Sequence, residues 1–116
     1  MNAATPTTEL TDEQTDRVFH ALAAATRRDI LRRTIEREQS VSALAADYDM
    51  SFAAVQKHVA VLEAAELVVK RAEGRERLVR ADPAMIARAR ALLARYESLW
   101  RARIDRLDAL LADDPD

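Results

Sequence analysis

The side chains best suited to chemistry in this chain are amides, hydroxyls and cations, and they fall into three groups along the sequence. The first group is Ser51, Phe52, Ala53, Gln56, Lys57 and His58. A glutamine amide can pair with an adenine edge, a lysine can reach guanine or a phosphate, and apolar side chains can touch a thymine methyl. The chemistry that this group supports is recognition of a base edge in DNA.

Some members of this group have alternative interpretations. Phe52 could pack into the core at the start of its helix instead of facing DNA, and both interpretations stay open. His58 could contact a phosphate or pack within its own motif. Ser51 is expected to cap the helix that carries the group, with its hydroxyl also available to a phosphate.

The second group is a cluster of cations around a predicted β-hairpin. Residues 67–69 open a β-rich run, and Glu73-Gly74 supplies a turn with the only glycine of the chain. The hairpin carries five cations: Lys70, Arg71, Arg75, Arg77 and Arg80. Such a cluster is typical of a wing that lies against the DNA backbone. We expect Arg71, Arg75 and Arg77 to make those contacts, with Arg75 at the tip.

The third group is Arg27 and Arg28, at the start of a predicted helix. Free backbone N–H groups and cations at a helix start suit a phosphate. The alternative is a solvated helix face.

The sequence offers little for catalysis or metal binding. It has no Cys, and its two histidines, His20 and His58, lie in separate segments expected to be helical. Protein zinc sites are built mainly from His and Cys. There is no glycine-rich phosphate loop, and no Ser, His and Asp set at catalytic spacing. We therefore expect no enzyme, no cofactor and no metal site.

Length and charge distribution fit one small domain with a nucleic-acid partner. The chain has 116 residues, 49% hydrophobic and 33% charged, with a net charge of −2. All 18 Lys and Arg nevertheless lie between Arg17 and Arg106, and acids cluster toward both ends. Because DNA affinity depends on local positive charge, the net charge does not exclude DNA. The cations could also merely solvate the surface.

No segment reads as a membrane span or a signal peptide. No apolar run approaches the roughly 20 residues that cross a bilayer, and residues 1–14 lack a basic start followed by an apolar stretch. We expect a cytoplasmic protein with no membrane partner.

Helices must position the three groups. Residues 1–10 show no periodic spacing of apolar residues and are expected to form a flexible tail. Thr11 and Gln14 have the spacing of a capping box and predict a first helix. Thr26 is expected to cap a second helix, and Ser40 or Ser42 a short third one.

A fourth helix, capped by Ser51, is expected over roughly residues 52–65. Its inward face is Val55, Val59 and Leu62, spaced at the helical period. Two short helices joined by a tight turn predict a helix-turn-helix, and the cationic hairpin follows directly.

Asp82 and Pro83 are a helix start, with an N-cap followed by proline. The last helix is expected to reach residue 111, about 40 Å long, with apolar residues three and four apart as in a coiled coil. We expect two copies to pair here, although one helix packed on its own domain is the alternative. The predicted dimer interface is Val18, Leu22, Leu93, Tyr96, Trp100, Ile104 and Leu107. The domain would span residues 11–111, followed by an acidic tail, residues 112–116.

Three segments between residues 18 and 82 read VFHALAAATRRDIL, SALAADYDMSFAAVQKHVAVLEAAELV and AEGRERLVRAD. In order and spacing they resemble the ArsR/SmtB family of winged helix-turn-helix transcriptional repressors. The resemblance implies a mainly α fold with a small β-hairpin, about five helices and a long C-terminal dimerisation helix.

The departures from the family pattern concern sensing and sequence preference. Many members bind metals through Cys in the third helix or His in the last, and this chain has neither there, so it resembles members without a metal site. Gln56-Lys57 stands where the family commonly has Ser-Gln, and Glu66 where it has Gly. The operator therefore cannot be transferred from relatives.

The resemblance implies a bacterial transcriptional repressor. It would bind double-stranded DNA as a homodimer, on an operator that is an inverted repeat. Two alternatives share the fold: a protein-interaction module that has lost DNA binding, and a sensor of a small-molecule effector of unknown identity. The expected DNA contacts are Arg27, Arg28, Ser51, Phe52, Ala53, Gln56, Lys57, His58, Arg71, Arg75 and Arg77.

Overall fold

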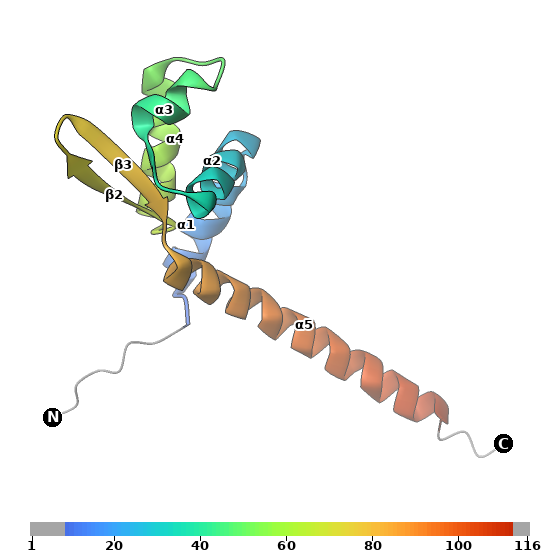
Figure 1. Ribbon diagram of the computed structural model, residues 1–116. Helices are drawn as coiled ribbons and strands as arrows, with labels where there is room; N and C mark the ends of the chain where they lie inside the picture. The colour runs from blue at the N-terminus through green and yellow to red at the C-terminus, as the bar shows by residue number, and fades with distance from the viewer. Residues whose placement is uncertain (1–8, 113–116) are drawn as a thin grey trace, which may run out of the picture.

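The computed structural model describes residues 9–112, which form five helices and three short strands (Figure 1). The helices are α1 (Asp12–Leu22), α2 (Ala25–Glu36), α3 (Val41–Ala46), α4 (Phe52–Ala64) and α5 (Pro83–Ala112). The strands are β1 (Gln39–Ser40), β2 (Val68–Glu73) and β3 (Glu76–Ala81). Within residues 9–112, no helix is both long and apolar enough to cross a membrane.

The predicted tails, residues 1–10 and 112–116, lie largely outside the described residues. Two residues at their inner ends belong to the folded domain: Leu10 packs against the core, and Ala112 is the last residue of α5.

Most of the predicted helix starts are confirmed. The Thr11 hydroxyl accepts from the Gln14 backbone N–H at 3.1 Å, and the Gln14 side chain accepts from the Thr11 N–H at 2.9 Å. Ser40 and Ser51 cap α3 and α4 in the same way. The prediction that Thr26 caps the second helix is wrong. Only Ala23 and Ala24 separate α1 from α2, so Thr26 already lies in the first turn, and Ala24 takes the N-cap without a side-chain bond.

The sheet is antiparallel with strand order β1-β3-β2. The predicted hairpin is present, and its two-residue loop begins with Gly74 at φ 62°, the positive φ of a type II′ turn. Strand β1 was not predicted, because its two residues are too few to show the alternation of a strand. It pairs Gln39 with Val79 and thereby fastens the start of α3 to the wing.

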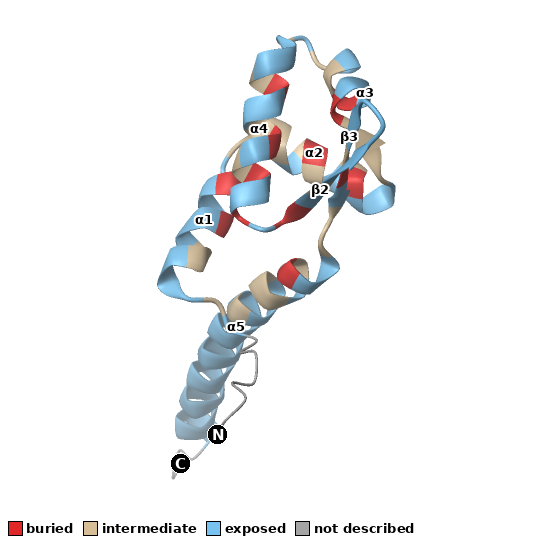
Figure 2. Ribbon diagram, turned by 90° about the vertical axis from the view of Figure 1, so that its left-hand side faces the viewer, coloured by how far each residue is buried: buried red, intermediate tan, exposed pale blue. Residues whose placement is uncertain are grey.

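The core is aliphatic and lies where α1 to α4 meet the sheet (Figure 2). Its largest fully buried side chains are Val18, Ile30, Leu44, Val55, Val59, Leu62, Leu67, Val68 and Val79. The expected inward face of the fourth helix is confirmed, since Val55, Val59 and Leu62 are all buried. Its opposite face is thereby left to solvent.

Helix α4 ends in a Schellman motif. The Leu67 N–H donates to the Leu62 carbonyl at 3.1 Å, and the Glu66 N–H donates to the Glu63 carbonyl at 2.9 Å. Glu66 stands at the left-handed position of this motif, with φ 62°, where glycine is usual. Leu62 and Leu67 are both buried, which completes the apolar contact typical of this ending.

Helix α5 begins on the core and then leaves it (Figures 1 and 2). Met85 is buried, and Ile86 and Ala89 pack against the core, but every residue from 93 to 112 is exposed. The Cα radius of gyration is 19.9 Å, whereas a compact domain of this length has about 13 Å. The last two thirds of α5 therefore project away from the rest of the protein.

Only Asp82 separates β3 from α5. Its backbone N–H donates to the Leu67 carbonyl at 2.9 Å, its own carbonyl accepts from the Ile86 N–H at 3.2 Å, and its carboxylate caps Ala84. With α3 and α4 as the helix pair and β2–β3 as the wing, the expected winged helix-turn-helix is confirmed.

Candidate nucleic-acid interface

The solvent face of α4 carries most of the first group of predicted contacts. Gln56 and Lys57 are exposed, and Phe52 is 47% exposed, because the buried residues of α4 lie on the opposite side. Ser51 and Ala53 are exposed at the same end of the helix. The core interpretation of Phe52 is therefore wrong, since the side chain begins α4 on its outer face.

Helices α3 and α4 and the wing enclose a groove of about 400 Å³, which we call the recognition groove. Its lining includes Ser42, Phe52, Gln56, Lys70, Arg75 and Arg77. The structure thus brings together four predicted contacts from two separate segments of the chain. Lys70 and Ser42 were not among the predicted contacts. Strand alternation offered a signal for Lys70, because antiparallel pairing places it on the same face of the wing as Arg77.

The cations near this groove differ in how far they are neutralised. Lys70 forms an ion pair with Glu63 at 3.3 Å. Within residues 9–112, Lys57, Arg75 and Arg77 have no ion pair. The exposed face of α4 and the tip of the wing therefore offer three positive charges to an external anion.

Arg71 lies on the other face of the wing and is held by carboxylates. Its guanidinium donates to both oxygens of Glu38, at 3.0 and 2.8 Å, and lies 3.1 Å from Glu73. The hydrogen bonds from Arg71 lower the pKa of Glu38 and keep it ionised. Arg71, one of the predicted DNA contacts, joins the wing to the segment after α2 and does not line the recognition groove.

Arg27 and Arg28 bind backbone carbonyls at the end of α1. Arg27 donates to the carbonyls of Ala21 at 2.8 Å and His20 at 2.9 Å, and Arg28 donates to that of Leu22 at 2.7 Å. The last carbonyls of a helix lack the i+4 partner found in its interior, and that of His20 also accepts from the Ala23 backbone N–H at 3.1 Å. Both predicted phosphate contacts at this helix start are thus engaged in bonds that join α1 to α2.

His58 takes part in the same arrangement. Its Nδ1 lies 3.2 Å from Nη1 of Arg27, and the side chain is half-buried. Of the two interpretations of His58, packing within the motif is the one that this geometry favours. His20 is exposed on α1. Within residues 9–112, no three His, Cys, Asp or Glu side chains come together as metal ligands.

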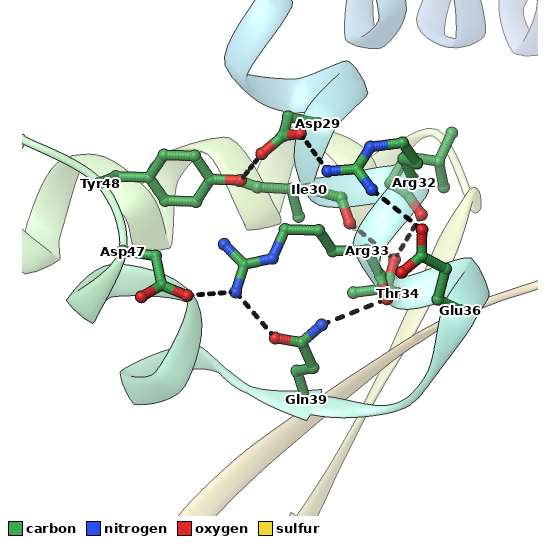
Figure 3. Close-up of polar contacts among 10 residues, drawn as sticks. Asp29, Ile30, Arg32, Arg33, Thr34, Glu36, Gln39, Asp47 and Tyr48 are labelled. Atoms are coloured by element: carbon green, nitrogen blue, oxygen red, sulfur yellow. Dashed lines mark hydrogen bonds and ion pairs between the residues drawn. The ribbon is translucent and has the colours of Figure 1, made fainter.

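A polar cluster joins α2 to β1 and to the end of α3 (Figure 3). The Arg33 guanidinium contacts Asp47 at 2.5 Å, donates to Gln39 at 3.0 Å, and lies over the Tyr48 ring, 5.5 Å from its centroid. The Gln39 side chain returns a bond to the Arg33 carbonyl at 3.2 Å. Arg33 therefore links α2 to β1 and to the end of α3.

The Tyr48 hydroxyl completes this cluster by donating to Asp29. Arg32 donates to the same carboxylate at 2.7 Å and to Glu36 at 2.9 Å. The hydrogen bonds from Tyr48 and then Arg32 lower the pKa of Asp29. The contacts of Arg32 follow the helical period, but the bonds from Tyr48 to Asp29 and from Arg33 to Asp47 join residues 19 and 14 positions apart and were not predicted.

The projecting part of α5 exposes a wide apolar face. Five predicted interface residues lie on it: Leu93, Tyr96, Trp100, Ile104 and Leu107, of which Trp100 is 59% exposed. Leu99, Leu110 and Leu111 are exposed on the same helix and were not among the predicted interface residues. Val18, also predicted for the interface, is 1% exposed because it packs in the core of its own chain. Leu22 is half-buried against the core.

Comparison with known proteins places this geometry among transcriptional regulators. Residues 22–71 match the sequence pattern of a helix-turn-helix domain family. The chain is 40% identical over 81 residues to the HTH-type transcriptional regulator Rv2034 of Mycobacterium tuberculosis, covering 70% of this chain and 76% of that protein.

Solved structures share the fold over most of their length. An ArsR-like transcriptional regulator from Rhodococcus sp. RHA1 has a TM-score of 0.75 and 32% identity, covering 84% of this chain and 92% of that one. A homodimeric winged helix-turn-helix DNA-binding domain from Mycobacterium bovis, described as a possible ArsR-family regulator, has a TM-score of 0.59 and 26% identity. That match covers 78% of this chain and 91% of the other.

Proposed function

This chain belongs to the ArsR family of winged helix-turn-helix transcriptional regulators, and from that premise we propose that it is a sequence-specific repressor acting as a homodimer on an inverted-repeat operator. The family consists of DNA-binding regulators and not of enzymes, in agreement with the sequence prediction. Bound at its operator, the dimer would exclude RNA polymerase, and this role places the protein in the bacterial cytoplasm.

The observation that carries the proposal is the recognition groove, where the exposed face of α4 meets a cationic wing. In winged and unwinged helix-turn-helix proteins, the second helix of the pair enters the major groove. With α4 in that position, Gln56 pairs with an adenine edge and Lys57 reaches guanine or a phosphate. Phe52 and Ala53 face thymine methyl groups, and the Ser51 hydroxyl meets the backbone.

The wing supplies charge without base specificity. Arg75 and Arg77 lie along the phosphate backbone, and each neutralised phosphate adds about 0.9 to the slope of log affinity against log salt. We leave Arg27, Arg28, His58 and Arg71 out of the proposed contacts, since each is bonded within the protein.

The proposed dimer forms through α5. Its exposed leucines, Tyr96 and Trp100 make an apolar face that nothing in residues 9–112 covers, and monomers rarely expose such large apolar patches. The homodimeric Mycobacterium bovis domain supports the same assembly. Two copies related by a two-fold axis present two α4 helices about 34 Å apart to successive major grooves, which requires an inverted repeat.

The repressor is proposed to act without a sensory metal. The chain has no Cys, and His58, one of its two histidines, is bonded to Arg27. Soft metals bind proteins mainly through thiolate and imidazole ligands, so the donor set does not suit the metal-sensing chemistry of this family.

The test is DNA binding to the region upstream of the protein's own gene, measured by fluorescence anisotropy against a shuffled duplex from 50 to 200 mM salt. Arg75→Ala should weaken binding to both duplexes and reduce the salt slope by about one. Gln56→Ala should instead remove part of the preference for the operator, about 1–3 kcal/mol. Arg90→Ala is the matched control, an exposed cation on α5 without an ion pair within residues 9–112.

Two results would contradict the proposal. One is a flat salt response or equal affinity for the two duplexes. The other is a full loss of DNA binding in Arg90→Ala with none in Arg75→Ala. Either would favour the protein-interaction module, whose partner would bind equally well to the Arg75 variant.

A further inference from the structure

A second groove lies on the face of the wing opposite the recognition groove. It has a volume of about 530 Å³ and is formed by the end of α2, the end of β3 and the first turn of α5. Figure 1 shows the junction where β3 runs into α5, beside which the residues lining the groove lie. We call this second groove the junction groove. In the antiparallel pairing Arg80 lies opposite Val69, and both side chains point to one face of the wing. Lys70 and Arg77 point to the other face, so the two grooves use opposite faces of the wing.

The floor of the junction groove is apolar. Ile35, Pro83 and Ile86 line it, and Ile35 is 57% exposed although it follows the buried Thr34 in α2. An exposed branched aliphatic side chain in a concave site gains free energy when an apolar group covers it. The volume falls within the usual range of small-molecule sites, about 300–1,000 Å³. The floor thus suits the apolar body of a small organic molecule.

The rim of the junction groove is cationic. Arg37 and Arg80 line it, and neither has an ion pair within the described part of the chain, residues 9–112. Glu38 also lines the groove, but Arg71 donates to both of its oxygens. The charge of Arg80 also acts on this carboxylate, and Arg37 and Arg80 together with one acid leave the rim with a net positive charge that attracts an anion. Guanidinium groups bind carboxylates with paired hydrogen bonds.

We infer that the junction groove binds a small organic carboxylate with an apolar body, its acid group held by Arg37 and Arg80 and its body lying on Ile35, Pro83 and Ile86. The site is separate from the recognition groove, and it involves none of the residues proposed to contact DNA. Both halves of the ligand are required, because the three apolar residues offer no polar partner, the Thr34 hydroxyl already donates within α2, and the two guanidinium groups bind only the acid.

The experiment is isothermal titration of the full chain, without DNA, with three probes. Octanoate carries both features, 1-octanol carries only the apolar body, and acetate carries only the charge. We expect octanoate to saturate one site per chain and the other two to bind at least ten-fold more weakly. Arg37→Gln and Arg80→Gln should each weaken octanoate binding by about ten-fold, and Arg80→Lys should restore part of it.

Arg90→Gln is the control for a general loss of positive charge, and circular dichroism reports folding of every variant. The inference is overturned if octanoate binds no more tightly than 1-octanol, or if Arg90→Gln weakens octanoate binding as much as Arg80→Gln. It is also overturned if octanoate binding survives both the Arg37 and the Arg80 substitution, because the ligand would then lie elsewhere, for instance on the apolar face of α5. Since no DNA is present, these results are independent of the operator measurements.

Discussion

Replacing Glu66 by glycine should make the fold more stable. Glu66 ends helix α4 at φ 62°, and a side chain with a Cβ costs about 1–2 kcal/mol in this left-handed conformation. Glycine removes that cost but loses more backbone freedom on folding, by about 0.5–1 kcal/mol. The Glu66 side chain makes only a long contact with Gln14, at 3.5 Å on the surface. The net gain should be about 0.5–1 kcal/mol.

The assay is thermal unfolding followed by circular dichroism. A gain of this size corresponds to a rise in melting temperature of about 2–6 °C for a domain near this length. Protein concentration must be equal across variants, because assembly into a dimer would itself shift the transition. Urea titration of the same variants provides the free energy independently, provided the m-value does not change.

Three control variants separate the backbone effect from other causes. Glu66→Ala removes the same carboxylate but keeps the Cβ, so it should not gain stability. Glu66→Asn should gain part of it, since asparagine tolerates the left-handed region. Ala60→Gly, within the same helix at an ordinary helical φ, should lose about 1 kcal/mol. If Glu66→Gly is no more stable than Glu66→Ala, the strain argument is refuted.

Three further outcomes follow from other parts of the structure. Because bonds from Tyr48 and Arg32 lower the pKa of Asp29, their stabilising effect is present above its unfolded pKa and is lost on acidification. Melting temperature should therefore fall more steeply below about pH 5 in the wild type than in Asp29→Asn. Gly74→Ala meets no atom within 4 Å, so the strain of its φ alone should cost about 1 kcal/mol in urea titration; an unchanged midpoint would contradict this. Leu107→Asp should give a monomer in analytical ultracentrifugation where the wild type is a dimer, whereas Ala109→Asp, on the other side of α5, should not.

Features set by neighbours in the sequence could be predicted from the sequence. The Thr11 capping box, the Ser51 cap and the turn at Gly74 each depend on residues no more than three positions apart. The caps form because a side-chain oxygen accepts from a free backbone N–H, and the turn forms because glycine tolerates a positive φ. Both effects hold in any fold. The buried face of α4 follows from the helical period in the same way.

Features set by distant partners could not be predicted. Arg71 was assigned to DNA from its place in the hairpin, but Glu38, 33 residues earlier, accepts two hydrogen bonds from it. Arg27 was assigned to a phosphate, but its guanidinium donates to two carbonyls at the end of α1. Cations on a polar surface give the same pattern whether they meet phosphate or a carboxylate of their own chain, and only the fold distinguishes the two.

The single-residue connection at Asp82 has a consequence for how operators can vary. Its backbone N–H and carbonyl are hydrogen-bonded to Leu67 and Ile86, respectively. No hinge therefore lies between the winged helix-turn-helix and α5, the helix that joins the two copies in the proposed dimer. In the proposed dimer, the distance between half-sites is then determined by where the α5 helices cross and not by a flexible linker. A change in operator spacing would therefore require substitutions in α5, far from any residue that touches a base.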